Sequence, residues 1–119
     1  MIAHIVLFRP RPGLDANTRR GLVQAFSDAL SEIGSIKQAR IGRRTMHGRP
    51  YEQLMRENYT HAAILEFDDL AGLRAYLEHP SHEALAARFF ACFEQALMYD
   101  FELHEGAAGL DALVETEEA

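Results

Sequence analysis

The chain has 119 residues, of which 48% are hydrophobic and 25% are charged, and this balance is typical of one ordinary globular domain, not of a disordered or fibrous protein. Its formal net charge of -6 repels nucleic acid and anionic membrane surfaces, and no segment approaches the roughly 20 apolar residues of a membrane span. The single cysteine, Cys92, excludes an internal disulfide, and the opening segment lacks the features of a secretion signal, so we expect a cytoplasmic protein.

The first third of the chain predicts a strand followed by a helix. Residues 1–9 hold a short β-branched and aromatic run that ends at prolines. Asp15 stands where an N-cap accepts the free amides of a helix that reaches about Ile33, and Gly34 follows where glycine often ends a helix. The apolar side chains of this helix recur at helical spacing and form a stripe for the core, namely Leu22, Phe26, Leu30 and Ile33.

Two further strands follow, separated by a long connection. Residues 36–45 alternate apolar with polar side chains, which suits a strand at the edge of a sheet. Residues 46–58 form a loop in which Tyr51 to Met55 can make one helical turn. Residues 59–67 are apolar on both faces and predict a more central strand.

The last third predicts two helices and a closing strand. Asp68 and Asp69 cap a short helix that runs through Glu78, and Pro80 sits well in the first turn of another that reaches about Ala96. This second helix carries Cys92 in an apolar stretch, so we assign the thiol to the core. Residues 97–103 then alternate as a strand.

The element order β-α-β-β-α-α-β predicts an α+β fold, with one antiparallel sheet and its helices on one face. We divide the chain into a folded domain, 1–104, and a frayed acidic tail, 105–119. Several strands are apolar on both sides, and a monomer cannot leave so much contiguous apolar sheet in water. We therefore expect a two-fold homodimer closed through the open face of the sheet.

The stretch from Tyr76 to Glu83 is the first candidate for chemistry. Pro80 as the first helical residue puts His82 in the first turn, where the helix dipole disfavours the protonated imidazole. A neutral His82 can act as a base near neutral pH, and Tyr76 on the preceding helix stands close enough to help enolise a carbonyl compound. The alternative is that both side chains only cap and pack the helix junction.

Two more histidines suggest a pocket on the helix side of the sheet. His4 and His61 share strand faces with apolar neighbours and point inward with His82 if that face looks toward the helices. Asp100 can orient His82, or it is a solvated carboxylate. The expected lining consists of His4, His61, Val6, Phe8, Phe26 and Leu65.

A metal site is the more specific alternative for these histidines. The possible ligands are His4, His61, His79 and His82. His4 and His61 begin antiparallel strands, however, and so lie toward opposite ends of the sheet. No local ligand motif is present either. We therefore expect neither a metal nor another cofactor.

The one basic cluster lies on and after the second strand and consists of Arg40, Arg43, Arg44, His47 and Arg49. Such a cluster can bind a carboxylate or a phosphate. A solvated edge strand whose charges are paired explains the cluster better. The sequence alone leaves both readings open.

Several short segments together resemble the stress-responsive A/B barrel family: His4 to Phe8, Tyr59 to His61 with Ile64 to Phe67, His79 to His82, and Tyr99 to Phe101. The likeness covers about residues 1–103 in matching order. It implies a ferredoxin-like subunit that forms a dimeric α+β barrel.

The resemblance also implies site residues, taken from a plant polyketide cyclase of that family. Its catalytic tyrosine and histidine match Tyr76 and His82, its pocket histidines match His4 and His61, and an aspartate beside its base matches Asp100. The cyclase has a pocket tyrosine where this chain has Phe26, and the connection over 42–59 is longer and rich in arginine. These departures leave the substrate open.

Three functions remain in view. In the first, the chain is a cofactor-free enzyme that performs acid/base chemistry on a small carbonyl compound. In the second, it is a non-enzymatic dimeric module that either binds a small carbonyl or carboxylate ligand or protects against stress. A cofactor-independent monooxygenase or isomerase of the wider dimeric barrel group is the third. The sequence does not decide whether the chain is an enzyme.

Overall fold

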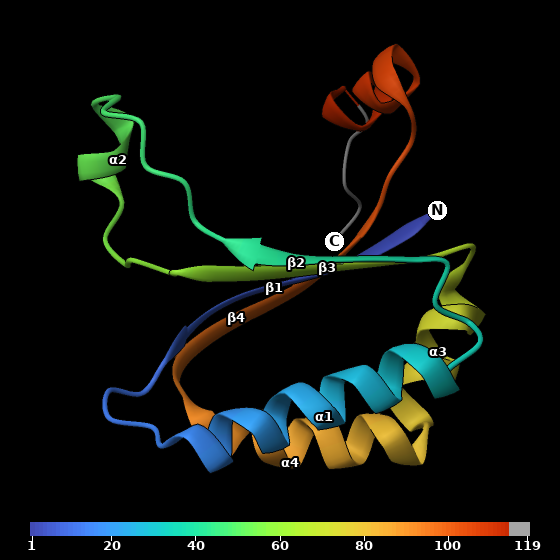
Figure 1. Cartoon of the computed structure of the whole chain (residues 1–119). Coiled ribbons are helices and arrows are strands. Elements are labelled where there is room, and N and C mark those ends of the chain that lie inside the picture. The colour runs from blue at the N-terminus through green and yellow to red at the C-terminus, as the bar shows by residue number, and fades with distance from the viewer. Residues whose placement is uncertain (115–119) are drawn as a thin grey trace, which may run out of the picture.

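The computed structural model describes residues 1–114, which fold as one antiparallel sheet with a layer of helices on one of its faces (Figure 1). The strands lie in the order β2-β3-β1-β4, so β2 is an edge strand as the sequence predicts. The strands are β1 (Ile2–Pro10), β2 (Gln38–Arg43), β3 (His61–Phe67) and β4 (Phe93–Glu102). The helices are α1 (Ala16–Glu32), α2 (Tyr51–Leu54), α3 (Leu70–Glu78), α4 (Pro80–Cys92) and the 3-10 helix η1 (Gly106–Leu113).

Strand β1 lies at the centre of the sheet and divides its side chains between the two faces. His4 pairs with Leu65 of β3 on one side and with Asp100 of β4 on the other. Because side chains alternate along a strand, these three residues share the face that the helices cover. Neighbouring residues such as Ile5 point to the opposite face.

The core between sheet and helices consists of two hydrophobic clusters. One is built around Phe67, Leu73 and Tyr76, and the other around Phe8 and Phe93 with their neighbours. Leu22 and Phe26 of α1 pack against both clusters. Cys92 is 1% exposed, which confirms its assignment to the core.

Side-chain caps begin the helices at the expected places. Asp15 accepts a hydrogen bond from the Thr18 amide at 2.7 Å, and Asp69 accepts one from the Gly72 amide at 2.9 Å. His79 caps α4, because its Nδ1 accepts a hydrogen bond from the Ser81 amide at 3.0 Å. These caps satisfy amides that have no partner within the first turn of a helix.

The end and the inner face of α1 differ from the prediction. Ile33, not Gly34, is the C-cap, and within residues 1–114 a positive φ occurs only at Gly13, Gly48 and Gly106. Leu30 is 38% exposed, while the small residues Ala25 and Ala29 are buried. The reason is that α1 lies beside α4 as well as over the sheet, so its most buried positions are those that allow another helix to approach (Figure 1).

Helix α4 ends four residues earlier than predicted, at Cys92, and β4 begins at Phe93. Phe93 is buried against Phe8, with ring centroids 4.5 Å apart, and against Phe89 at 4.3 Å. Helical spacing alone did not reveal this change, because an aromatic residue fits the apolar stripe of α4 and the inner face of β4 equally well.

The tail was expected to be frayed from residue 105, which is wrong for residues 106–113, because they form η1. The acidic residues 115–119 lie outside the described part of the chain. Helices η1 and α2 both rise from the face of the sheet opposite α1 and α4 (Figure 1).

The open face of the sheet carries apolar side chains. Leu97, Tyr99 and Phe101 of β4 are 37%, 57% and 47% exposed, and they alternate with residues of the covered face. Beside them lie Ile5 and Leu7 of β1 and Ile64 of β3. Among residues 1–114, no helix combines the length and the apolar character needed to cross a membrane.

Candidate functional site

A cavity of about 140 Å³ lies between the covered face of the sheet and the corner at which α3 meets α4. The sheet contributes histidine and apolar side chains, and the two helices contribute a tyrosine and a second histidine. Six of the residues that the sequence suggested for a site line this cavity: His4, Val6, Phe26, Leu65, Tyr76 and His82.

Tyr76 and His82 meet because α3 turns sharply into α4. The His79 amide donates to the Tyr76 carbonyl at 3.2 Å, and the His82 amide donates to the His79 carbonyl at 2.9 Å, so the chain folds tightly around Pro80. The two rings then lie with centroids 4.7 Å apart and an interplanar angle of 63°. The ring of His4 approaches Tyr76 from the sheet, with centroids 5.8 Å apart.

The environment of His82 favours a neutral imidazole. Burial lowers the pKa of His82, and the nearby charge of His4 lowers it further. A backbone hydrogen bond at Leu77 and the carboxylate of Glu83 act in the opposite direction. Burial is thus the main cause of the lowered pKa, where the sequence had suggested the helix dipole. A neutral imidazole at physiological pH can accept a proton.

Tyr76 keeps its proton at physiological pH. The side chain is 3% exposed, and burial raises the pKa of its hydroxyl to about 12. No group within residues 1–114 forms a hydrogen bond with this hydroxyl. A neutral hydroxyl at the edge of a cavity can donate to a ligand oxygen, and it stabilises negative charge that develops there.

Asp100 lies on the covered face, but its partner is His4. A carboxylate oxygen of Asp100 is 2.6 Å from Nδ1 of His4, a distance typical of a charge-assisted hydrogen bond. The sequence had suggested that Asp100 orients His82 directly. In the structure Asp100 fixes the ring of His4, and His4 in turn faces Tyr76.

His61 and Phe8 lie four residues further along the strands and contact a second space. They pair across β1 and β3 and stack with ring centroids 5.5 Å apart and an angle of 14°. Both line a larger cleft of about 1120 Å³ beneath α1, which Phe26 also lines. Burial lowers the pKa of His61, and the charge of Arg43 lowers it further.

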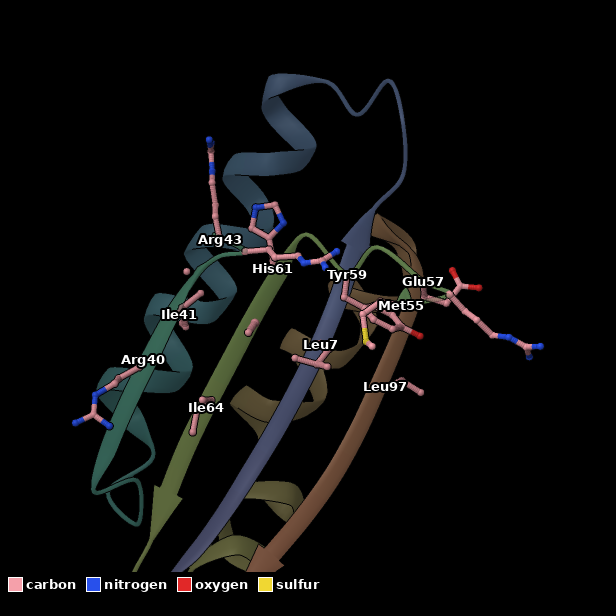
Figure 2. Close-up of a pocket in the computed structure, with 14 residues that line it drawn as sticks. Leu7, Arg40, Ile41, Arg43, Met55, Glu57, Tyr59, His61, Ile64 and Leu97 are labelled. Atoms are coloured by element: carbon pink, nitrogen blue, oxygen red, sulfur yellow. The ribbon is translucent and has the colours of Figure 1, made fainter. Parts of the chain in front are cut away.

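The basic cluster does not gather around one point. A hollow of about 670 Å³ is lined by Arg40 and Arg43, with Leu7, Ile64 and Leu97 of the sheet. Figure 2 shows how these side chains lie. Arg40 and Arg43 point away from each other, and Arg43 stands beside His61 (Figure 2). Arg40 approaches Glu66 at 3.6 Å, and Arg44 donates to the side chain of Asn58 at 2.7 Å.

The histidines of the described chain do not form a metal centre. His4 pairs with Leu65, whereas His61 pairs with Phe8 at the end of the β1–β3 ladder, so the two histidines stand four residue pairs apart along it. Across residues 1–114, no group of three or more histidine, cysteine, aspartate or glutamate side chains is arranged to hold a metal ion.

Sequence reasoning missed part of the cavity wall. Leu85 and Phe89 of α4 belong to the core clusters and also line the small cavity, as does Met98 of β4. Arg43 was assigned to the basic cluster, but its position opposite His61 was not predicted. The antiparallel pairing of β2 and β3 is the signal that would have found it, but the long loop between them hides the register.

Comparisons with known proteins agree with this architecture. The family model described as Stress responsive A/B Barrel Domain matches residues 2–103. A stress-response A/B barrel domain-containing protein of Arabidopsis thaliana is 24% identical over 80 residues, which are 67% of this chain and 68% of that protein.

Solved structures show the same fold. A dimeric ferredoxin-like protein of unknown function from Thermobifida fusca superposes with a TM-score of 0.65 at 27% identity, over 86% of this chain and 90% of that one. A hydroxynitrile lyase from Passiflora edulis superposes with a TM-score of 0.71 at 18% identity, over 88% of this chain and 94% of that one. Four antiparallel strands with helices on one face therefore form a ferredoxin-like fold, as the sequence predicts.

Proposed function

The chain belongs to the stress-responsive A/B barrel family, and from that premise we propose that it is a homodimer whose subunits each bind a small carbonyl compound and promote cofactor-free acid/base chemistry on it. His82 is the base, and Tyr76 is the donor to the carbonyl oxygen. One observation carries this proposal: the two rings meet edge to face, with centroids 4.7 Å apart, in the wall of one cavity.

The assigned roles follow from the protonation states. His82 is neutral near pH 7 because burial lowers its pKa, so it can remove a proton from the carbon beside a carbonyl group. Tyr76 is protonated because burial raises its pKa to about 12, so it can donate to the oxygen on which negative charge develops. His4, held by Asp100 at 2.6 Å, is a positioning residue that limits how Tyr76 moves.

The open face of the sheet supports the homodimer. Its apolar row from β1, β3 and β4 would remain in water in a single subunit. The similar protein from Thermobifida fusca is described as dimeric and ferredoxin-like. We place the family domain at residues 1–104 and the protein in the cytoplasm, where its single cysteine needs no oxidising environment.

A hydroxynitrile lyase of the same fold gives limited support for catalysis, because at 18% identity only the fold is shared. The second candidate function is a binding module without catalysis. The observation that favours it is the mainly apolar lining of the 140 Å³ cavity, which can hold a ligand without acting on it.

The test measures exchange of α-carbon protons for deuterium by NMR, with a panel of small methyl ketones and β-keto esters. We expect the wild-type protein to accelerate exchange for at least one of them. His82→Gln should lower the rate by about 10²–10⁴-fold, as is usual for loss of a general base, and Tyr76→Phe by about 10²–10³-fold. His104→Gln is the matched control, because this histidine is half exposed and outside the cavity.

Exchange at the wild-type rate in His82→Gln would show that His82 is not the base. A wild-type protein that binds members of the panel but accelerates exchange of none would be a binding module, and the catalytic part of the proposal would be wrong.

A further inference from the structure

The cleft beneath α1 is far larger than the cavity at Tyr76 and His82, and its chemistry is amphipathic. It measures about 1120 Å³, which is the size of a site for a drug-sized molecule. Most of its wall is apolar, with Leu22, Phe26 and Leu30 from α1 facing Phe8 and Phe93 from the sheet. A space of this size and polarity suits a ligand with an extended apolar body.

The charged side chains of the cleft are all cationic, although the whole chain carries a net charge of -6. Arg9, Arg19 and Arg43 line the cleft, and no aspartate or glutamate does so within residues 1–114. Arg9 is already neutralised, because it approaches Glu94 at 3.3 Å and Glu57 at 3.4 Å. Arg19 and Arg43 form no ion pair with any residue of the described chain.

Arg43 and His61 form a pair at one end of the cleft. They lie opposite each other at the ends of β2 and β3, with their side chains on the same face of the sheet (Figure 2). Side chains that pair across strands stand about 5 Å apart at Cβ, close enough for both to reach one carboxylate group. Thr60 holds the ring of His61 at 2.8 Å through Nδ1, which leaves Nε2 for a ligand.

The cleft also adjoins the cavity that contains Tyr76 and His82. Phe26 lines both spaces and packs against both hydrophobic clusters, so its ring lies where the two spaces adjoin. A ligand held at Arg43 and His61 can therefore extend beneath α1, with its far end beside Phe26 and the two catalytic candidates.

We propose that the cleft binds an amphipathic carboxylate, whose anionic group contacts Arg43 and His61 and whose apolar chain lies beneath α1 against Phe26. This inference deepens the proposed function, because it names the substrate class: a carboxylate with an apolar body and a carbonyl group that reaches His82. The reaction at the carbonyl group rests on the proposed function. The binding step itself needs only the cleft.

The experiment measures binding of decanoate and of decanol to the full-length chain by isothermal titration calorimetry. Wild type should bind both. Arg43→Gln should weaken decanoate binding about tenfold or more and leave decanol binding unchanged, because only the carboxylate uses the charge-assisted contact. Arg40→Gln is the control: it lies on the same strand, three residues away, points elsewhere and approaches Glu66 at 3.6 Å. Its decanoate affinity should stay within about twofold of wild type.

The inference would be overturned if wild type and Arg43→Gln bound decanoate with equal affinity, or if Arg43→Gln and Arg40→Gln lost decanoate affinity to the same extent. The absence of saturable decanoate binding to wild type would overturn it as well. The two proposals fail separately. If decanoate binding depends on Arg43 but His82→Gln exchanges α-carbon protons at the wild-type rate, the catalytic role of His82 alone is overturned. Exchange that depends on His82, without binding of decanoate, would overturn the carboxylate site alone.

Discussion

The histidines on the covered side of the sheet link the site to the pH dependence of folding. Burial lowers the pKa of both His61 and His82 in the folded chain. In the unfolded chain both return to a pKa of about 6.5. Below that pH the unfolded state therefore binds more protons than the folded state, and the free energy of unfolding falls as the pH falls.

We therefore expect the free energy of unfolding to decrease from about pH 7 toward pH 5 and to flatten once the folded histidines are also protonated. His82→Gln should reduce the slope of unfolding free energy against pH, because it removes one of the two histidines whose pKa is lowered by folding. Urea denaturation at several pH values measures the effect, with His104→Gln as the control. A slope that is the same in wild type and His82→Gln would show that the pKa of His82 is not lowered in the folded state.

At the scale of single elements, α3 is the part whose start matters most to the site, because its second turn carries Tyr76. Asp69 accepts a hydrogen bond from the Gly72 amide at 2.9 Å and so satisfies one of the free amides of that helix. The adjacent Asp68 is exposed and only approaches Lys37, at 3.5 Å. The two neighbouring aspartates thus have different roles.

Asp69→Ala should lower the free energy of unfolding by about 1 kcal/mol, the usual cost of losing an N-cap. Asp68→Ala should change it by less than about 0.5 kcal/mol, because exposed ion pairs contribute little. Chemical denaturation of both variants at one pH gives the comparison. Equal effects would mean that the cap does not stabilise α3.

The elements also show what could be predicted from sequence. The caps at Asp15 and Asp69 and the helix start at Pro80 were predictable, because each depends on residues adjacent in the chain. The boundary at Cys92 and Phe93 was not, since a buried aromatic suits both a helix and a strand. The position of Asp100 was predicted only in part: alternation gave its face, but the choice of His4 as its partner depends on the register between β1 and β4.

At the scale of the whole molecule, the sheet separates the proposed ligand side from the proposed dimer side. The helices cover one face, and the apolar row that includes Leu97 and Tyr99 occupies the other. In a two-fold dimer each substitution is present twice at the same interface, so its effect on association is doubled. This makes the open face sensitive to single changes.

Leu97→Asp should raise the dimer dissociation constant by about 100-fold or more, because each subunit would have to bury an unpaired carboxylate against its partner. Val23→Asp is the control, since this side chain is 66% exposed on α1, in the helix layer. Sedimentation velocity over a concentration series measures both. A wild-type chain that remains monomeric at micromolar concentration would contradict the homodimer, and a Leu97→Asp chain as dimeric as wild type would place the interface elsewhere.

The alternation along β1 also restricts how this protein can change over evolution. His4, Val6 and Phe8 face the helices, and the residues between them face outward. Insertion of one amino acid in the middle of β1 would exchange these two sets beyond the insertion, and it would damage the proposed ligand site and the proposed subunit contact together. The two faces of the sheet therefore constrain the length of β1 together, because a single-residue change in its middle affects both.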